Sequence, residues 1–243
     1  MSSRVESLDG LMERCGTKEV QPSVEKYVQN GEPPWKADLF AEEQIRALIQ
    51  QVFFPGGPRS SHQVVFCAVD RHTDAAHVCT QIAKSMSLQL PGSVCLVETS
   101  SADQKLEKQL GADFGWSMSR KFSDASGKGG EKVAENLWLV RHLSLTAGRP
   151  EPLAPMWLRA RMSELRRQFD YAVIHAQAAG ISSEPALLGQ LCDGVILVLD
   201  ANNTRRAVAR QAVELLEAAN AKILGTILNQ RTFPIPETIY RKL

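Results

Sequence analysis

Short apolar runs alternate with amphipathic helical segments along most of this chain, and this alternation restricts its fold more than any other feature. Gln63–Phe66 has the composition of a buried strand, and the periodicity of Ala76–Met86 predicts a helix directly after it. The run Gly194–Leu199 (GVILVL) has no polar residue, which is typical of a strand covered on both faces of its sheet. The pattern predicts an α/β fold, with a mostly parallel sheet of about seven strands and helices on both faces.

The remaining elements follow from the same periodicities. Further strands are predicted over Ser93–Val97, Asn136–Val140, Tyr171–Ile174 and Lys222–Leu228. Further helices are predicted over Leu39–Phe53, Trp157–Arg167 and Pro185–Leu191. One more helix is predicted to begin after Thr204, as its N-cap, and to end near Ala219. The polar stretch from Thr99 to about Glu131 is expected to be loop, with its part Ser117–Gly130 exposed at the surface.

Composition places these elements in one soluble domain. Residues 1–38 are polar and lack periodicity, so we expect a flexible arm ahead of a single domain over 39–243. With 243 residues, 44% of them hydrophobic, the chain can bury a sizeable core. A net charge of +1 argues against a nucleic-acid partner. The first residues lack the apolar segment of a signal peptide, and no run is long enough to span a bilayer, so a cytoplasmic protein is expected.

The five cysteines are scattered and form no CxxC pair. Several lie in apolar strand or helix patterns, which predicts buried, reduced thiols. For Cys95, close to Glu98, a reactive thiol is the alternative to burial within a strand.

The turn between the first strand and its helix, Cys67–Ala75 (CAVDRHTDA), is the most informative local sequence. A nucleotide-binding fold places glycines here, which let backbone N–H groups approach phosphate, together with a lysine that neutralises the phosphate charge. This turn contains neither, and Asp70 and Asp74 add negative charge where phosphate would bind. The residues therefore predict a turn that no longer binds phosphate.

The second half of the chain carries a recognisable series of motifs. FDYAVIHAQAAG, CDGVILVLDANNT and AKILGTILN, separated by helices, resemble the bacterial tyrosine kinases of polysaccharide export, which belong to the deviant-Walker ATPase class. EEQIRALIQQVF, ENLWLV, MWLRARMSELRRQFDY and the ending RTFPIPETIYRKL are similar to the same family. The resemblance covers about Phe40 to Leu243 and implies a P-loop NTPase-like domain. In active members the activity would be that of an ATP-dependent protein tyrosine kinase.

Three departures from the family's pattern bear on its nucleotide site. Where the resemblance implies a GK[ST] element, the chain has Asp74, Ala75 and Ala76, so the lysine and the hydroxyl ligand of Mg²⁺ are missing. The acidic motif after the second strand is replaced by Glu98, Thr99 and Ser100.

The third departure is His175, which stands where the family has an aspartate that orients Mg²⁺ and water. Catalysis of phosphoryl transfer is mainly positioning and charge stabilisation, and losing one such group typically costs about 2.7–4 kcal/mol. We therefore expect no catalytic residue and no cofactor in this degenerate site.

These observations favour a non-catalytic, pseudokinase-like relative of the family that acts as a scaffold or regulator of exopolysaccharide or capsule biosynthesis. By resemblance, its partner is the cytoplasmic end of a membrane polysaccharide co-polymerase or an active kinase paralogue, which would recruit it to the inner face of the membrane. The family's tyrosine-rich tail is reduced here to Tyr240.

Two alternatives remain open. The first is an active tyrosine kinase that binds ATP and Mg²⁺ in an unusual site, in which Asn229 reads the adenine edge instead of serving as a turn residue. The second is a small-ligand or metal-binding module in the vacated crevice. Glu98 and His175 are its weak metal candidates, with His72 and His77 nearby, whereas a hydrogen-bonded His175 and surface histidines are the simpler interpretation.

Two further groups of charged residues have a double interpretation. Glu43 and Arg46 resemble the family's inter-subunit helix, which implies a homo-oligomer, but they also have the spacing of an exposed i,i+3 ion pair. Arg166–Arg167 and Arg205–Arg206 are either a basic patch for an acidic partner or a solvated helix surface.

Overall fold

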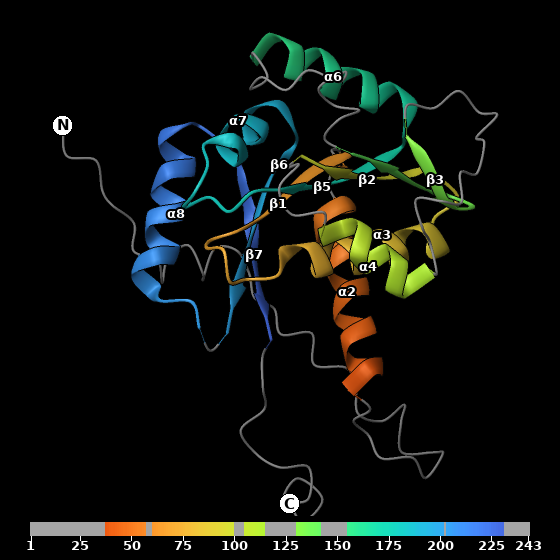
Figure 1. Ribbon diagram of the computed structural model, residues 1–243, viewed down its shortest axis with the longest axis horizontal. Helices are drawn as coiled ribbons and strands as arrows, with labels where there is room; N and C mark the ends of the chain where they lie inside the picture. Colours follow the sequence, from red (N-terminus) through yellow and green to blue (C-terminus); the bar gives the residue numbers. More distant parts are fainter. Residues whose placement is uncertain are drawn as a thin grey trace, which may run out of the picture.

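The computed structural model describes residues 37–56, 60–99, 105–114, 130–141, 155–201 and 203–230. It confirms the predicted class, because a seven-stranded sheet in the order β3-β4-β2-β5-β1-β6-β7 lies between helices (Figure 1). The arm predicted for residues 1–38 falls outside the described residues except for its last two positions, which begin a helix.

The elements have the following bounds. The strands are β1 (Gln63–Ala68), β2 (Val94–Glu98), β3 (Glu131–Ala134), β4 (Leu137–Val140), β5 (Tyr171–Ala176), β6 (Gly194–Asp200) and β7 (Ile223–Asn229). The helices are α2 (Ala37–Phe53), α3 (Ala75–Gln89), α4 (Lys105–Phe114), α6 (Pro155–Gln168), α7 (Glu184–Leu191) and α8 (Arg206–Ala218).

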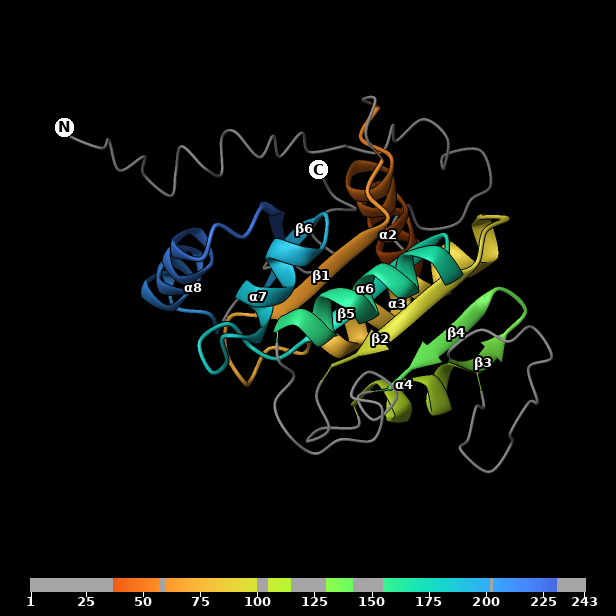
Figure 2. The same cartoon turned by 90° about the horizontal axis from the view of Figure 1, so that it is seen from above.

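The central strand β1 pairs in parallel with β5 and β6, and every residue of β1 is buried. Alternate side chains of β1 enter two separate cores. Val64 and Phe66 pack in the core that α2, α3 and α4 cover. Val65 and Cys67 pack in the core that α6, α7 and α8 cover. The two helix layers on opposite faces of the sheet (Figures 1 and 2) explain why this strand is apolar at successive positions.

The loop prediction for Thr99 to Glu131 is wrong in part, because it contains α4. Leu106 and Leu110, four residues apart, are completely buried against the sheet, and this contact stabilises a helix whose other residues are mostly polar. The same stretch ends in β3, which pairs antiparallel with β4. The expected surface loop over 117–129 lies outside the described residues.

The predicted N-cap of α8 is also wrong. Arg205 occupies the N-cap position, without a side-chain hydrogen bond to the helix. The Thr204 hydroxyl instead accepts the backbone N–H of Asp200 at 2.8 Å. Thr204 therefore closes the turn after β6. The local sequence pattern did not distinguish a hydroxyl that accepts the Asp200 N–H from one that accepts an N–H in the first turn of α8.

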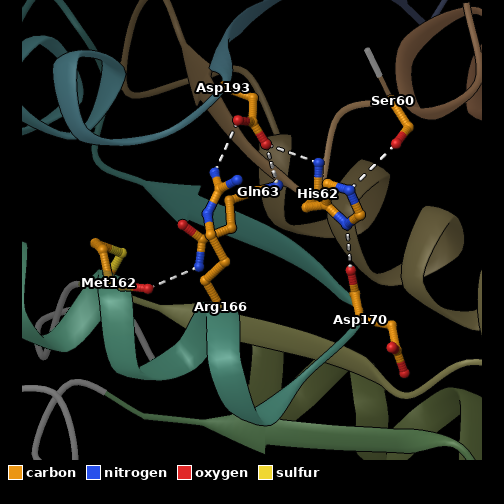
Figure 3. Close-up of polar contacts among 7 residues, drawn as sticks. All are labelled: Ser60, His62, Gln63, Met162, Arg166, Asp170 and Asp193. Carbon is orange, nitrogen blue, oxygen red and sulfur yellow. Dashed lines mark hydrogen bonds and ion pairs between the residues drawn. The ribbon is translucent and has the colours of Figure 1, made fainter. Parts of the chain in front are cut away.

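A carboxylate joins three segments at the amino ends of the strands. One Asp193 oxygen accepts the backbone N–H groups of His62 and Gln63 at 2.7 and 2.8 Å, and the other accepts the Arg166 guanidinium at 2.7 Å (Figure 3). Burial alone would raise the pKa of Asp193, but the hydrogen bonds from Arg166, Gln63 and His62 outweigh it and hold the pKa below its ordinary value. The contact connects β1, the start of β6 and the end of α6.

His62 is held in the same region. Its Nδ1 donates to the Asp170 carbonyl oxygen at 3.0 Å, and its Nε2 lies 3.1 Å from the Ser60 hydroxyl (Figure 3). Its ring stacks on that of Tyr171 with the centroids 5.9 Å apart. The Asp170 carboxylate accepts the backbone N–H and the hydroxyl of Ser93, both at 2.8 Å. These contacts brace the amino ends of the strands.

Candidate functional site

The carboxyl ends of β2, β5 and β1 meet at one edge of the sheet, where ligands bind in open α/β folds. Glu98 pairs in register with His175, and His175 pairs with Phe66 two residues before the end of β1. This register places Glu98 and His175 beside each other at the edge of the sheet where the first turn begins, and their sharing of a ligand crevice with that turn stays a prediction.

The first turn, residues 69–74, uses its own backbone donors. A single oxygen of Asp70 accepts the backbone N–H of His72 at 2.9 Å, the backbone N–H of Thr73 at 3.0 Å and the Thr73 hydroxyl at 3.2 Å. In a phosphate-binding turn, N–H groups of this kind point at the ligand. Here they point at a carboxylate of the same turn.

The amino end of α3 is occupied in the same way. Asp74 is its N-cap, and the Asp74 carboxylate accepts the backbone N–H of His77 at 3.1 Å. The next two residues, Ala75 and Ala76, are buried at 2% and 0% exposure and carry neither an amine nor a hydroxyl. His72 and His77 are exposed, as the simpler interpretation of the sequence predicts.

The loop after β5 packs directly on the first turn. The backbone N–H groups of Ala179 and Gly180 donate to the carbonyl oxygens of Ala68 and Val69, at 2.9 and 3.3 Å. A Cβ atom at position 180 would lie 2.9 Å from the Val69 oxygen, so only glycine permits this approach. The backbone of the loop after β5 therefore lies directly against the backbone at the end of β1 and the start of the first turn.

Glu98 has a structural partner. It is 4% exposed, and its carboxylate accepts the backbone N–H of Leu106 at 3.4 Å, in the first turn of α4. A carboxylate is favourable there because the first N–H groups of a helix lack intrahelical acceptors and its dipole is positive at that end. This role of Glu98 was not predicted from the sequence, because α4 was predicted to be loop.

His175 is 8% exposed, and its carbonyl oxygen accepts both the backbone N–H and the hydroxyl of Thr99, at 3.2 and 3.0 Å. Glu98 and His175 are thus neighbours that could supply two metal ligands. Within the part of the chain that the structure describes, no group of three or more His, Cys, Asp or Glu residues is suitably placed for a metal ion.

Asn229 and Asp200 are partners at the ends of β7 and β6. The Asn229 carbonyl oxygen accepts the backbone N–H of Ala201 at 2.9 Å, and Asn229 is half-buried. Asp200 is 4% exposed, and one of its carboxylate oxygens, Oδ1, has no hydrogen-bond partner among the described residues. Asp200 was not among the residues predicted from the sequence, although a charged residue that ends a fully apolar strand is a recognisable signal.

The oligomer candidates form an intrachain pair. The Arg46 guanidinium lies 2.8 Å from the Glu43 carboxylate on α2, and both side chains are between two-fifths and half exposed. This is the predicted i,i+3 ion pair, and the inter-subunit role stays a prediction. Ser100 and Tyr240 lie outside the described residues.

Burial also decides the chemistry of the thiols. Cys67, Cys79 and Cys95 are fully buried, so the prediction of a buried Cys95 is confirmed. Burial raises the pKa of the Cys67 and Cys192 thiols to about 12 and raises that of Cys79 well above its ordinary value. Thiolate nucleophiles are therefore not available from these residues at neutral pH.

Sequence comparison identifies bacterial relatives over part of the chain. Tyrosine-protein kinase CpsD of Streptococcus agalactiae serotype III is 31% identical over 84 residues, which are 33% of this chain and 36% of the relative. CpsD of Streptococcus pneumoniae serotype 4 is 28% identical over 96 residues, 40% of this chain and 42% of the relative. The matched segments thus span well under half of these curated relatives. No family model matches the sequence.

Structural comparison extends the likeness to most of the chain. The chimerical protein CapA2B2 has a TM-score of 0.60 at 14% identity, covering 79% of this chain and 85% of that structure. The kinase domain of the Escherichia coli tyrosine kinase ETK has a TM-score of 0.58 at 13% identity, covering 81% and 79%. The MinC:MinD cell division complex of Aquifex aeolicus has a TM-score of 0.55 at 14% identity, covering 75% and 72%. At these identities, the structures establish the fold.

Among the described helices, none combines the length and the apolar composition that crossing a lipid bilayer requires. The sequence relatives and the fold agree with the resemblance noted in the sequence. Over about a third of its length the chain is similar in sequence to bacterial tyrosine kinases such as CpsD, and its fold is similar to that of a bacterial tyrosine kinase domain.

Proposed function

We propose that this protein is a non-catalytic, pseudokinase-like member of its family that acts as a scaffold or regulator of exopolysaccharide biosynthesis. The observation that carries this proposal is the closed first turn. Asp70 and Asp74 accept the backbone N–H groups of His72, Thr73 and His77, which are the kind of donors a bound phosphate would need.

Charge strengthens the argument. A nucleotide would bring several negative charges to a turn that already contains two carboxylates, and no lysine stands in the turn to offset them. To admit phosphate, the hydrogen bonds of Asp70 and Asp74 would have to break, and both carboxylates would then lose their backbone N–H donors, which costs free energy. Both effects oppose nucleotide binding, and the absence of the hydroxyl at Ala76 removes a magnesium ligand as well.

A scaffold needs only a folded surface. The proposed partner is the cytoplasmic end of a membrane polysaccharide co-polymerase or an active kinase paralogue. The proposed homo-oligomer contact uses the exposed Glu43 and Arg46 of α2, whose ion pair at the surface costs little to exchange for an intermolecular one because exposed pairs contribute at most about 1 kcal/mol.

Isothermal titration calorimetry with ATP and ADP, with and without Mg²⁺, tests the proposal. The kinase domain of the tyrosine kinase ETK serves as a positive control. We expect no heat of binding at millimolar nucleotide and no rise in melting temperature, since a ligand that binds only the native state stabilises it by mass action. Micromolar binding of ATP would contradict the proposal and favour the active-kinase alternative. Stabilisation by a divalent metal alone would favour the metal-binding alternative.

A further inference from the structure

Helix α6 is the outermost element on its face of the sheet. It lies over the sheet as a ridge and runs along the direction of the strands beneath it (Figures 1 and 2). Leu158, Met162 and Leu165 point inward and are buried at 4%, 2% and 0% exposure. This spacing turns the opposite side of the helix towards solvent along its whole length.

The outward side combines large apolar side chains with cations. Met156 is 76% exposed and Trp157 is 57% exposed, although both are residues that normally favour burial. Arg159 and Arg167 are exposed on the same helix, eight residues apart. At 1.5 Å per residue, the face from Met156 to Arg167 is about 16 Å long.

The arginines of α6 differ in whether a carboxylate neutralises them. Arg161 pairs with Glu164 at 2.6 Å, and Arg166 pairs with Asp193 at 2.7 Å. Considering the described residues alone, neither Arg159 nor Arg167 has a carboxylate within salt-bridge distance. The part of α6 that is not buried therefore carries two arginines without a carboxylate partner among the described residues, together with two exposed apolar side chains.

We propose that the outward face of α6, defined by Met156, Trp157, Arg159 and Arg167, docks directly on a membrane surface that contains anionic phospholipids. A helix of this kind lies in the plane of the interface, with its apolar side chains at the acyl boundary and its arginines at the phosphates. Tryptophan is favoured at this depth because its ring is apolar and its N–H is polar.

The shape of the surface favours a membrane over an acidic peptide. Peptides are usually bound in grooves, which bury both sides of the bound segment. α6 is a convex ridge, and a lipid surface can adapt to a ridge. The charge is also spread along the helix, which suits a surface of many phosphates.

A hollow of about 320 Å³ at the carboxyl end of α6 gives a phosphate access to Arg167. Arg166, Arg167 and His62 are among the residues that line it. Asp170 lies in the same wall, but its carboxylate is already bonded to Ser93. Because Arg166 is paired with Asp193, Arg167 is the cation that this hollow offers, at the end of the ridge farthest from Met156 and Trp157.

Flotation of the full chain with vesicles tests this proposal. Vesicles of phosphatidylcholine alone are compared with vesicles in which phosphatidylglycerol makes up about a third of the lipid. We expect stronger binding to the anionic vesicles and a steep loss of binding at high salt, because the phosphate contacts are electrostatic. Each arginine near such a surface contributes about fivefold to the affinity, so R159Q/R167Q should weaken binding about 25-fold.

Matched variants separate the face from general charge and hydrophobicity. M156S/W157S should reduce binding to both kinds of vesicle, whereas L88S removes an equally exposed apolar side chain (76%) from α3 and should have no effect. R205Q/R210Q removes two exposed arginines, one at the N-cap of α8 and one within the helix, and should retain most of the binding. All these side chains are exposed, so unchanged melting temperatures will show that the variants fold.

Three results would overturn the proposal. One is no flotation with anionic vesicles at low salt. Another is equal loss of binding in R159Q/R167Q and R205Q/R210Q, which would indicate nonspecific attraction. The third is binding of a polyglutamate peptide, but not of vesicles, through the same arginines, which would assign the face to an acidic protein.

Discussion

The carboxylate of Asp70 accepts both the backbone N–H and the hydroxyl of Thr73, at 3.0 and 3.2 Å. These contacts close the turn after β1 on itself. Asp74 does the same for the amino end of α3. The turn after β1 and the amino end of α3 are therefore locally hydrogen-bonded parts of the framework.

Substituting the N-cap of α3 should destabilise the fold. Asp74→Ala removes the acceptor of the His77 N–H and should lower the free energy of unfolding by about 1 kcal/mol, as is typical for the loss of a helix cap. Urea denaturation measures the change. Asp74→Asn retains a capping oxygen and should lose much less. Equal losses in both variants would show that the charge of Asp74, and not its hydrogen bond, stabilises the helix.

Asp193 should make stability depend on pH in the acid range. Its pKa in the folded state is lowered, so the stabilisation that it provides is fully present above its unfolded pKa of about 3.9. That stabilisation is lost as the pH falls through the lower folded pKa. In urea unfolding from pH 7 to pH 3, the wild type should lose stability more steeply below about pH 4 than Asp193→Asn.

A matched pair checks the origin of this effect. Arg166→Gln removes the guanidinium that faces Asp193 and should reduce the acid-dependent loss, whereas Arg167→Gln, at the next position, should leave the profile unchanged. If both arginine variants behaved like the wild type, the backbone donors of His62 and Gln63 would account for the lowered pKa on their own.

The packing of α7 against the sheet should depend on a glycine. A Cβ atom at Gly189 would lie 2.5 Å from the Val195 side chain and 2.7 Å from that of Ala221. Gly189→Ala should therefore cost about 1–3 kcal/mol of stability through overpacking. Gly225→Ala, on β7, meets nothing within 4 Å and should have little effect. Thermal unfolding of both variants compares them, and equal melting temperatures would contradict this packing.

The buried thiols should be unreactive in the native state. Cys67, Cys79 and Cys95 are completely buried, and burial raises the pKa of Cys67 to about 12, so almost no thiolate of Cys67 is present at pH 8. In a Cys15→Ser/Cys192→Ser variant, which also removes the half-buried Cys192, a thiol reagent such as Ellman's should react negligibly with the folded protein and with three thiols in urea. Rapid reaction of one thiol without denaturant would identify a local opening around it.

The sequence by itself determined the class of the fold and the character of its turn. Short, fully apolar runs such as Gly194–Leu199 are typical of buried strands, whereas helices have an apolar periodicity of about 3.6 residues. The alternation of these two patterns predicted the mostly parallel sheet. The lack of glycine and lysine in Cys67–Ala75 is likewise a property of the residues alone. The resemblance to the bacterial tyrosine kinases was also readable from short motifs.

Only the tertiary structure decided the features that depend on contacts distant in sequence. α4 exists because Leu106 and Leu110 find a buried surface, and Glu98 acquires its role only once that helix is in place. Asp193 lies 131 residues from His62, whose N–H it accepts, so no local pattern marks that contact. The outward face of α6 is another such feature, since helical periodicity predicts a helix, and only packing decides which of its sides faces solvent.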